Sequence, residues 1–258
     1  MLHLELIDTH THLYLPEFDS DRDEVVASAI QNGVTRLLMP NIDANSLDPM
    51  LAAVNRYPGI CYPMIGLHPT SVKEDYLSQI KELEKQLTNH RFVAVGETGI
   101  DLYWDKTFIK EQIESFRHHV ELSLKLDLPL VIHSRESFNE IFSVLEDFKG
   151  RNLKGVFHAF TGDTVLAEKA ISMGFKLGIG GIVTFKNSGL DKVVKETGPE
   201  HLVLETDSPY LAPAPHRGKR NESAYICIIS TKLSEIFDMA VDEIASVTYR
   251  NSMELFKL

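Results

Sequence analysis

The feature of the sequence that most constrains its fold is a regular alternation of short apolar runs with longer amphipathic stretches. Eight runs rich in apolar and β-branched residues predict strands at residues 4–10, 35–41, 61–68, 92–98, 128–134, 154–160, 176–181 and 201–207. The segments between them carry apolar residues at helical spacing, and two further helical segments follow the eighth run. This count and order predict an α/β fold of the (β/α)8 type, a TIM barrel, which typically takes about 250 residues.

The chain length is consistent with one domain. Because α/β barrels commonly fill such a length without a second unit, residues 1–258 are expected to form a single barrel domain. The runs at 128–134 and 201–207 are almost continuously apolar, which is typical of parallel strands covered on both faces. An open doubly wound sheet is the alternative, but the glycine-rich phosphate turn that normally follows an early strand of that fold is not visible.

Charge and composition limit the class of protein. The net charge is −11, so tight binding of long duplex DNA, which normally uses a basic face, is not expected. No apolar stretch is long enough to cross a bilayer, and the first residues lack the pattern of a signal peptide. The two cysteines make no disulfide framework. We therefore expect a cytoplasmic protein with no membrane association and no obligate protein partner.

Residue types that bind metals gather at the predicted strand ends, where barrels of this type build their active sites. His10 and His12 end the first run, and residues two apart in a strand point to the same face. Later runs end in His68, Glu97, His133, His158 and Asp207. Burying so much polarity on one rim without partners is costly, so the joint pattern predicts a metal site. Histidines on the predicted helices, such as His119, are expected to be packing or solvated residues.

The number of candidate ligands predicts two divalent ions rather than one. Catalytic zinc usually takes three protein ligands and a water, so six side chains with a bridging carboxylate indicate a pair of ions. We expect two groups of ligands that share Glu97 as the bridge: His10, His12 and Asp207 on one ion, and His133 and His158 on the other. Imidazole ligands favour manganese or zinc over magnesium, but the sequence leaves the metal open among Mg, Mn and Zn.

The motifs around these residues resemble those of the TatD family of metal-dependent deoxyribonucleases, in the amidohydrolase-like group of barrels. The motifs run in order from Asp8 to Asn221: DTHTHL, GLHP, GETGID, VIHSR, FHAF and ETDSPYLAP…RGKRN. The resemblance implies a (β/α)8 barrel with divalent metals at the strand ends, held by the six ligands given above. It also implies hydrolysis of phosphodiester bonds in DNA, often as a 3′-to-5′ exonuclease, and an active-site role for His68 outside the core ligand set.

The expected chemistry is attack by a metal-activated water on phosphorus. Asp207 is expected to act as general base as well as ligand, and Glu97 to hold the two ions at a fixed separation. His68 is expected to hydrogen-bond a phosphate oxygen or to protonate the leaving group. Glu205 precedes Asp207 by two residues and either orients a ligand or bound water or pairs with a neighbouring strand. The same two alternatives apply to Asp8.

Substrate contacts are expected from basic residues near the rim. Arg135 lies two residues beyond His133, and the cluster at 216–220 contains Arg217 and Lys219. Five aromatic residues are candidates either for stacking on unpaired bases or for the core: Tyr14, Phe18, Tyr103, Trp104 and Phe160.

The acidic charge favours short single-stranded DNA ends over long duplex, which agrees with exonuclease action. The alternative is an amidohydrolase-like enzyme that acts on a small amide, lactone or phosphoester, because barrels of this type support many hydrolyses. Activity on RNA is also left open, since no motif that reads bases or the 2′-hydroxyl is visible.

Overall fold

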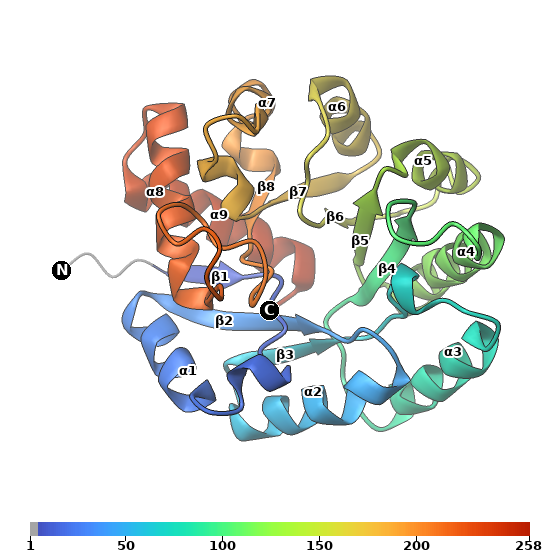
Figure 1. The fold of residues 1–258 in the computed structure, drawn as a ribbon. Helices are drawn as coiled ribbons and strands as arrows, with labels where there is room; N and C mark the ends of the chain where they lie inside the picture. The colour runs from blue at the N-terminus through green and yellow to red at the C-terminus, as the bar shows by residue number, and fades with distance from the viewer. Residues whose placement is uncertain (1–4) are drawn as a thin grey trace.

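The chain folds into a closed (β/α)8 barrel, as the alternation of strands and helices predicts (Figure 1). The structure, a computed structural model, describes residues 5–258; Leu4, the first residue of the first predicted strand, lies outside them. The described strands are β1 (Leu6–Asp8), β2 (Val34–Pro40), β3 (Cys61–Met64), β4 (Val95–Asp101), β5 (Leu130–Arg135), β6 (Gly155–Phe157), β7 (Phe175–Ile179) and β8 (Leu202–Leu204).

Helices surround the strands, and two of them follow β8 as predicted. The α-helices found in residues 5–258 are α1 (Arg22–Gln31), α2 (Ala44–Arg56), α3 (Tyr76–Lys85), α4 (Ile109–Leu126), α5 (Phe138–Glu146), α6 (Thr164–Ser172), α7 (Leu190–Thr197), α8 (Ile226–Phe237) and α9 (Val241–Phe256). Short 3-10 helices lie at Pro16–Phe18, Pro69–Ser71, Gln86–Thr88, Gly181–Thr184, Pro199–His201 and Ser223–Tyr225. Within this described range, none of the helices is long and apolar enough to cross a membrane.

The strands pair in parallel and in sequence order. One ladder joins β1, β2 and β3, and a second joins β4 to β8. Two isolated parallel bridges connect the ladders, Ile65 with Val95 and Thr11 with Ser208, and so close the barrel. Because the strands all run in one direction, their carboxyl ends meet on one rim, which we call the strand-end rim.

An apolar layer inside the barrel supports the polar site above it. Val131 of β5, Val156 of β6 and Val203 of β8 belong to one buried cluster, together with the end of α9. Successive strand residues alternate between faces, so residues two apart share a face. The residues two places after these valines therefore face the same interior, one layer nearer the strand-end rim: His133, His158 and Glu205.

The strand boundaries differ from the predicted ones in ways that affect the site. β4 ends at Asp101, three residues beyond the predicted end at residue 98. The prediction is short because the buried segment TGID is not an apolar run. β1, β3, β6 and β8 are shorter than predicted. Predicted site residues therefore follow these strands rather than lie within them, among them His10, His68, His158 and Asp207.

Candidate active site

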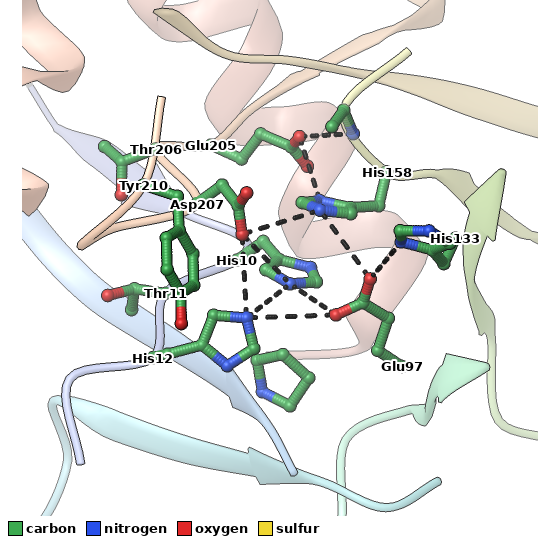
Figure 2. A network of polar contacts seen from close by, with 12 residues as sticks. His10, Thr11, His12, Glu97, His133, His158, Glu205, Thr206, Asp207 and Tyr210 are labelled. Carbon is green, nitrogen blue, oxygen red and sulfur yellow. Dashed lines mark hydrogen bonds and ion pairs between the residues drawn. The ribbon is translucent and has the colours of Figure 1, made fainter. Parts of the chain in front are cut away.

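The six predicted ligands converge on the strand-end rim, with Glu97 between the histidines (Figure 2). Oε2 of Glu97 lies 3.1 Å from His10 Nε2 and 3.8 Å from His12 Nε2. Oε1 lies 2.9 Å from His133 Nδ1 and 3.8 Å from His158 Nε2. The two oxygens of one carboxylate thus face two different pairs of histidines, which is the arrangement a bridging ligand requires.

Asp207 is the second carboxylate of the site. Its Oδ1 lies 3.7 Å from His10 Nε2, 3.6 Å from His12 Nε2 and 3.6 Å from His158 Nε2. The Asp207 side chain is 14% exposed, whereas that of Glu97 is 3% exposed. Asp207 is therefore the carboxylate that solvent and substrate can reach.

The spacing of the ligand atoms fits divalent cations. Atoms bound at about 2.1 Å in a tetrahedral site stand ~3.4 Å apart, and the contacts of Glu97 and Asp207 with His10 and His12 span 3.1 to 3.8 Å. His10 Nε2 and His12 Nε2 also face each other at 3.3 Å. Buried imidazole nitrogens that converge in this way on two carboxylates form the mixed nitrogen and oxygen donor set preferred by zinc and manganese.

A hydrogen bond orients the His12 ring, and an ion-pair contact orients the His158 ring. Tyr14 Oη donates to the carbonyl of Pro40 at 2.7 Å, so the Nδ1–H of His12 donates to Tyr14 Oη at 3.0 Å. Nδ1 of His158 lies 3.0 Å from Glu205 Oε1, in a carboxylate–imidazole pair. In both rings Nε2 is the nitrogen that faces the cluster, where a metal ligand would act.

His133 is held from both sides. Its Nε2–H donates to Asp101 Oδ2 at 2.9 Å, and its Nδ1 faces Glu97 Oε1 at 2.9 Å. Burial opposes ionisation of Asp101, but the hydrogen bond to His133 and the backbone N–H of Trp104 outweigh burial and lower its pKa. Asp101 stands in the GETGID motif but is not among the predicted site residues, because the strand is expected to end before it.

His68 presents a protonated ring nitrogen to Glu97. The backbone N–H of Thr70 donates to Nδ1 at 3.2 Å, so the neutral ring carries its proton on Nε2. That nitrogen lies 3.3 Å from Glu97 Oε1. His68 therefore stands beside Glu97 as a hydrogen-bond donor, and His68, Glu97 and His133 also bring three potential metal-ligating atoms close together.

The electrostatics of the cluster keep both carboxylates ionised. Burial opposes charge on Glu97, but the neighbouring histidines, led by His68, hold its pKa well below the usual range. The pKa of Asp207 is lowered against burial by histidines led by His158. Burial also opposes charge on His158, but Glu205, Glu97 and Asp207 raise its pKa to about 10. Two ionised carboxylates in one buried cluster attract cations.

The structure separates the alternatives that the sequence left open for Glu205 and Asp8. Glu205 is buried behind His158, and its Oε1 accepts the backbone N–H of Ala159 at 2.6 Å. It orients a predicted ligand and does not reach the opening, so its expected catalytic role becomes one of positioning. Asp8 instead accepts from the backbone N–H of Thr206 at 2.9 Å and from its hydroxyl at 2.6 Å, which ties neighbouring strand ends together.

Replacing Gly178 by alanine tests the positioning role of Glu205. A Cβ on Gly178 would lie 2.3 Å from Glu205 Oε2, so the carboxylate must shift from its present place beside His158. We expect Gly178→Ala to fold and to bind divalent metal about 10- to 100-fold more weakly, as measured by titration calorimetry. Gly180→Ala is the matched control, because its Cβ meets its first neighbour at 3.6 Å. Equal affinities of the two variants would contradict the role.

A buried histidine on α4 supports the segment that carries His68. His119 is 2% exposed, donates from Nδ1 to the carbonyl of Ser115 at 2.7 Å and accepts the backbone N–H of Leu67 at 3.1 Å. Burial lowers its pKa to about 4. It is thus a packing residue, one of the two alternatives expected from sequence, and it fixes the backbone just before His68.

The buried neutral state of His119 makes stability depend on pH. In the unfolded chain the ring protonates near pH 6.5, so its contribution is complete above that pH and is lost as pH falls toward 4. We expect wild type to lose on the order of 3 kcal/mol more unfolding free energy than His119→Gln between pH 7 and 4. Urea unfolding across this range measures the difference, and parallel curves would refute it.

The predicted basic contacts lie in different surroundings. The Arg135 guanidinium stands 3.8 Å from the centre of the Tyr103 ring, and that of Arg217 stands 4.6 Å from the centre of the Phe185 ring. Lys219 is exposed. The fifth residue of the basic cluster, Arg220, is bound by Asp21 and Glu222 and is not free for phosphate.

The five candidate aromatic residues divide by burial. Tyr14, Phe18 and Phe160 are buried and belong to the core. Tyr103 and Trp104 are 49% and 68% exposed, in the loop that follows β4. Only this second pair is placed where it can meet a ligand.

Convergent imidazoles and ionised carboxylates at the strand ends of a (β/α)8 barrel are the features expected of a metal-dependent hydrolase. The family model described as TatD related DNase matches residues 7–257. The chain therefore belongs to the TatD family.

Relatives and solved structures agree with this assignment. The chain is 36% identical over 257 residues to YabD of Bacillus subtilis, an uncharacterized metal-dependent hydrolase, covering 98% of this chain and 99% of the relative. It is 32% identical to YcfH of Escherichia coli, also an uncharacterized metal-dependent hydrolase, covering 98% and 96%. The crystal structure of YjjV, a TatD homolog from Escherichia coli, superposes with a TM-score of 0.92 and 28% identity over 100% of both chains.

Proposed function

We propose that the protein hydrolyses phosphodiester bonds in DNA and removes nucleotides from the 3′ end of a single strand. The observation that carries the proposal is Glu97, whose two oxygens face separate sets of histidines, with Asp207 and the donor His68 beside it. This arrangement suits two divalent ions, of Mg, Mn or Zn, in an in-line displacement at phosphorus. The name of the matching family model supports DNA as the substrate.

The protein's own groups then have separate tasks. Bound divalent ions supply Lewis acidity to the attacking water and to the phosphoryl oxygens. Asp207 is ionised and partly exposed, so its carboxylate accepts the proton of the attacking water. His68 donates from Nε2–H to a phosphoryl or leaving oxygen. Glu205 acts through His158, whose ring it holds in place.

A short single strand suits the charge of this protein better than a long duplex. The net charge is −11. Three predicted basic contacts form no ion pair among residues 5–258 and can bind phosphate: Arg135, Arg217 and Lys219. Few phosphate contacts suffice for a strand end, whereas duplex binding uses many. Cys61 and Cys227 are both free, which supports the cytoplasm as the compartment. DNA is the only partner that we propose.

A nuclease time course tests the proposal. Single- and double-stranded DNA labelled at either end would be incubated with the protein and Mg²⁺, Mn²⁺ or Zn²⁺, with a chelator as control. We expect metal-dependent loss of nucleotides from the 3′ end, fastest on single strands. Products cut internally, or loss from the 5′ end, would overturn the exonuclease assignment. No cleavage with any metal would move the search to small phosphoesters, amides and lactones.

A further inference from the structure

Two exposed aromatic rings and an arginine form a surface beside the candidate active site. Tyr103 and Trp104 meet edge to face, with ring centres 4.9 Å apart. The guanidinium of Arg135 lies 3.8 Å from the Tyr103 ring centre and 5.3 Å from that of Trp104. We call these three residues the aromatic–arginine platform. Large aromatic side chains that lie exposed next to each other are typical of binding sites, because a bound ligand can remove their apolar surface from water.

The platform is held rigidly against the site. Oδ1 of Asp101 accepts the backbone N–H of Tyr103 at 2.9 Å and that of Trp104 at 3.1 Å. Oδ2 of the same carboxylate accepts from His133 Nε2 at 2.9 Å. One buried side chain therefore fixes both the predicted ligand His133 and the loop that carries the rings.

The position of Arg135 places the platform on the open side of the cluster. Arg135 follows His133 by two residues at the end of β5, so both side chains leave the strand on the same face. His133 is 17% exposed, against 0% for His10 on the other side of Glu97. A cavity of about 100 Å³ lies between Trp104 and the turn at Pro69 that follows His68. Substrate bound at the opening would thus extend over the platform.

We propose that the aromatic–arginine platform binds an unpaired nucleobase of the substrate strand by stacking. The inference rests on the proposed function and names the part of the substrate that this surface recognises. Every base offers a ring face to an aromatic side chain, so such recognition tolerates any sequence. Arg135 forms no ion pair among residues 5–258, so its N–H groups are available for the phosphate next to the stacked base. The platform therefore selects strands with bases over bare phosphoesters.

Fluorescence provides a direct readout, because Trp104 is the only tryptophan of the sequence. A full-length Asp207→Asn chain with Mg²⁺ would be titrated with a short oligothymidylate and with an abasic strand of equal length and charge. We expect saturable quenching by the oligothymidylate and binding of the abasic strand that is about 5- to 150-fold weaker. No quenching, or equal affinity for the two strands, would overturn the inference.

Steady-state kinetics test the same surface in the active protein. We expect Trp104→Leu to raise KM for oligothymidylate about 5- to 150-fold with kcat almost unchanged. Trp104→Tyr keeps an aromatic ring, so its KM should stay close to that of wild type. Leu77→Ala, at an exposed apolar residue of α3, is the control. If wild type cleaves strands and Trp104→Leu has the same KM, the base-binding role of the platform is refuted and the proposed function stands. If wild type cleaves no strand but the oligothymidylate quenches Trp104, the proposed function fails and the base-binding platform stands.

Discussion

Asp207→Asn is expected to lower kcat for phosphodiester hydrolysis about 10²- to 10⁴-fold, the range for loss of a general base. The carboxylate is ionised against its burial by the histidines around it, and it is the acidic group of the cluster nearest to solvent. An asparagine of the same shape keeps an oxygen toward His10, His12 and His158 but cannot accept a proton. The fold should persist, so the thermal midpoint serves as the check on folding.

Asp191→Asn is the matched control for this experiment, because it removes the same charge from an exposed position on α7. It should retain full activity. Retention of more than about a tenth of the wild-type kcat by Asp207→Asn would assign proton transfer to another group.

Glu97→Gln is expected to abolish most of the metal binding. Both Glu97 oxygens face histidine nitrogens, and the carboxylate is almost completely buried. Even partners that only orient a ligand cost about 10- to 100-fold in affinity when removed, so loss of the bridge should exceed that range. Titration calorimetry of the metal-stripped protein with Mn²⁺ or Zn²⁺ measures the effect.

Glu121→Gln, at an exposed position on α4, controls for the loss of charge and should bind metal as wild type does. If Glu97→Gln bound the same number of ions at wild-type affinity, Glu97 would not be the bridge.

The sequence predicted the barrel and the place of the site because both follow from local patterns. Alternating apolar runs and helical segments determine the order of the strands, and parallel strands bring their last residues together. His10, Glu97 and His158 therefore meet in space although they are far apart in the chain. The shared interior face of His133 with Val131 also follows from strand periodicity.

The features of the site that could not be predicted from sequence depend on contacts between distant segments. Asp101 was missed because a buried polar strand end does not look apolar, and only the pairing of β4 with β5 reveals its bond to His133. The proton of His68 is placed by Thr70, which no spacing rule predicts. Arg220 belongs to the basic cluster in sequence, but its ion pair with Asp21, a residue about 200 positions away, cannot be predicted from that cluster.

The aromatic residues show the same limit. Phe160 and Trp104 lie in similar loops after strands, and both were candidates for either core or ligand contact. Phe160 is 1% exposed and packs edge to face on Phe138 of α5, whereas Trp104 is 68% exposed.

The central claim is that the histidine and carboxylate cluster on the strand-end rim holds the divalent ions of a hydrolytic centre. Crystals soaked in Mn²⁺ and measured for anomalous scattering test this claim most directly. We predict two peaks at the cluster, one among His10, His12 and Asp207 and one beside His133 and His158, with Glu97 between them. Saturating Mn²⁺ that leaves no peak among these residues would contradict the claim.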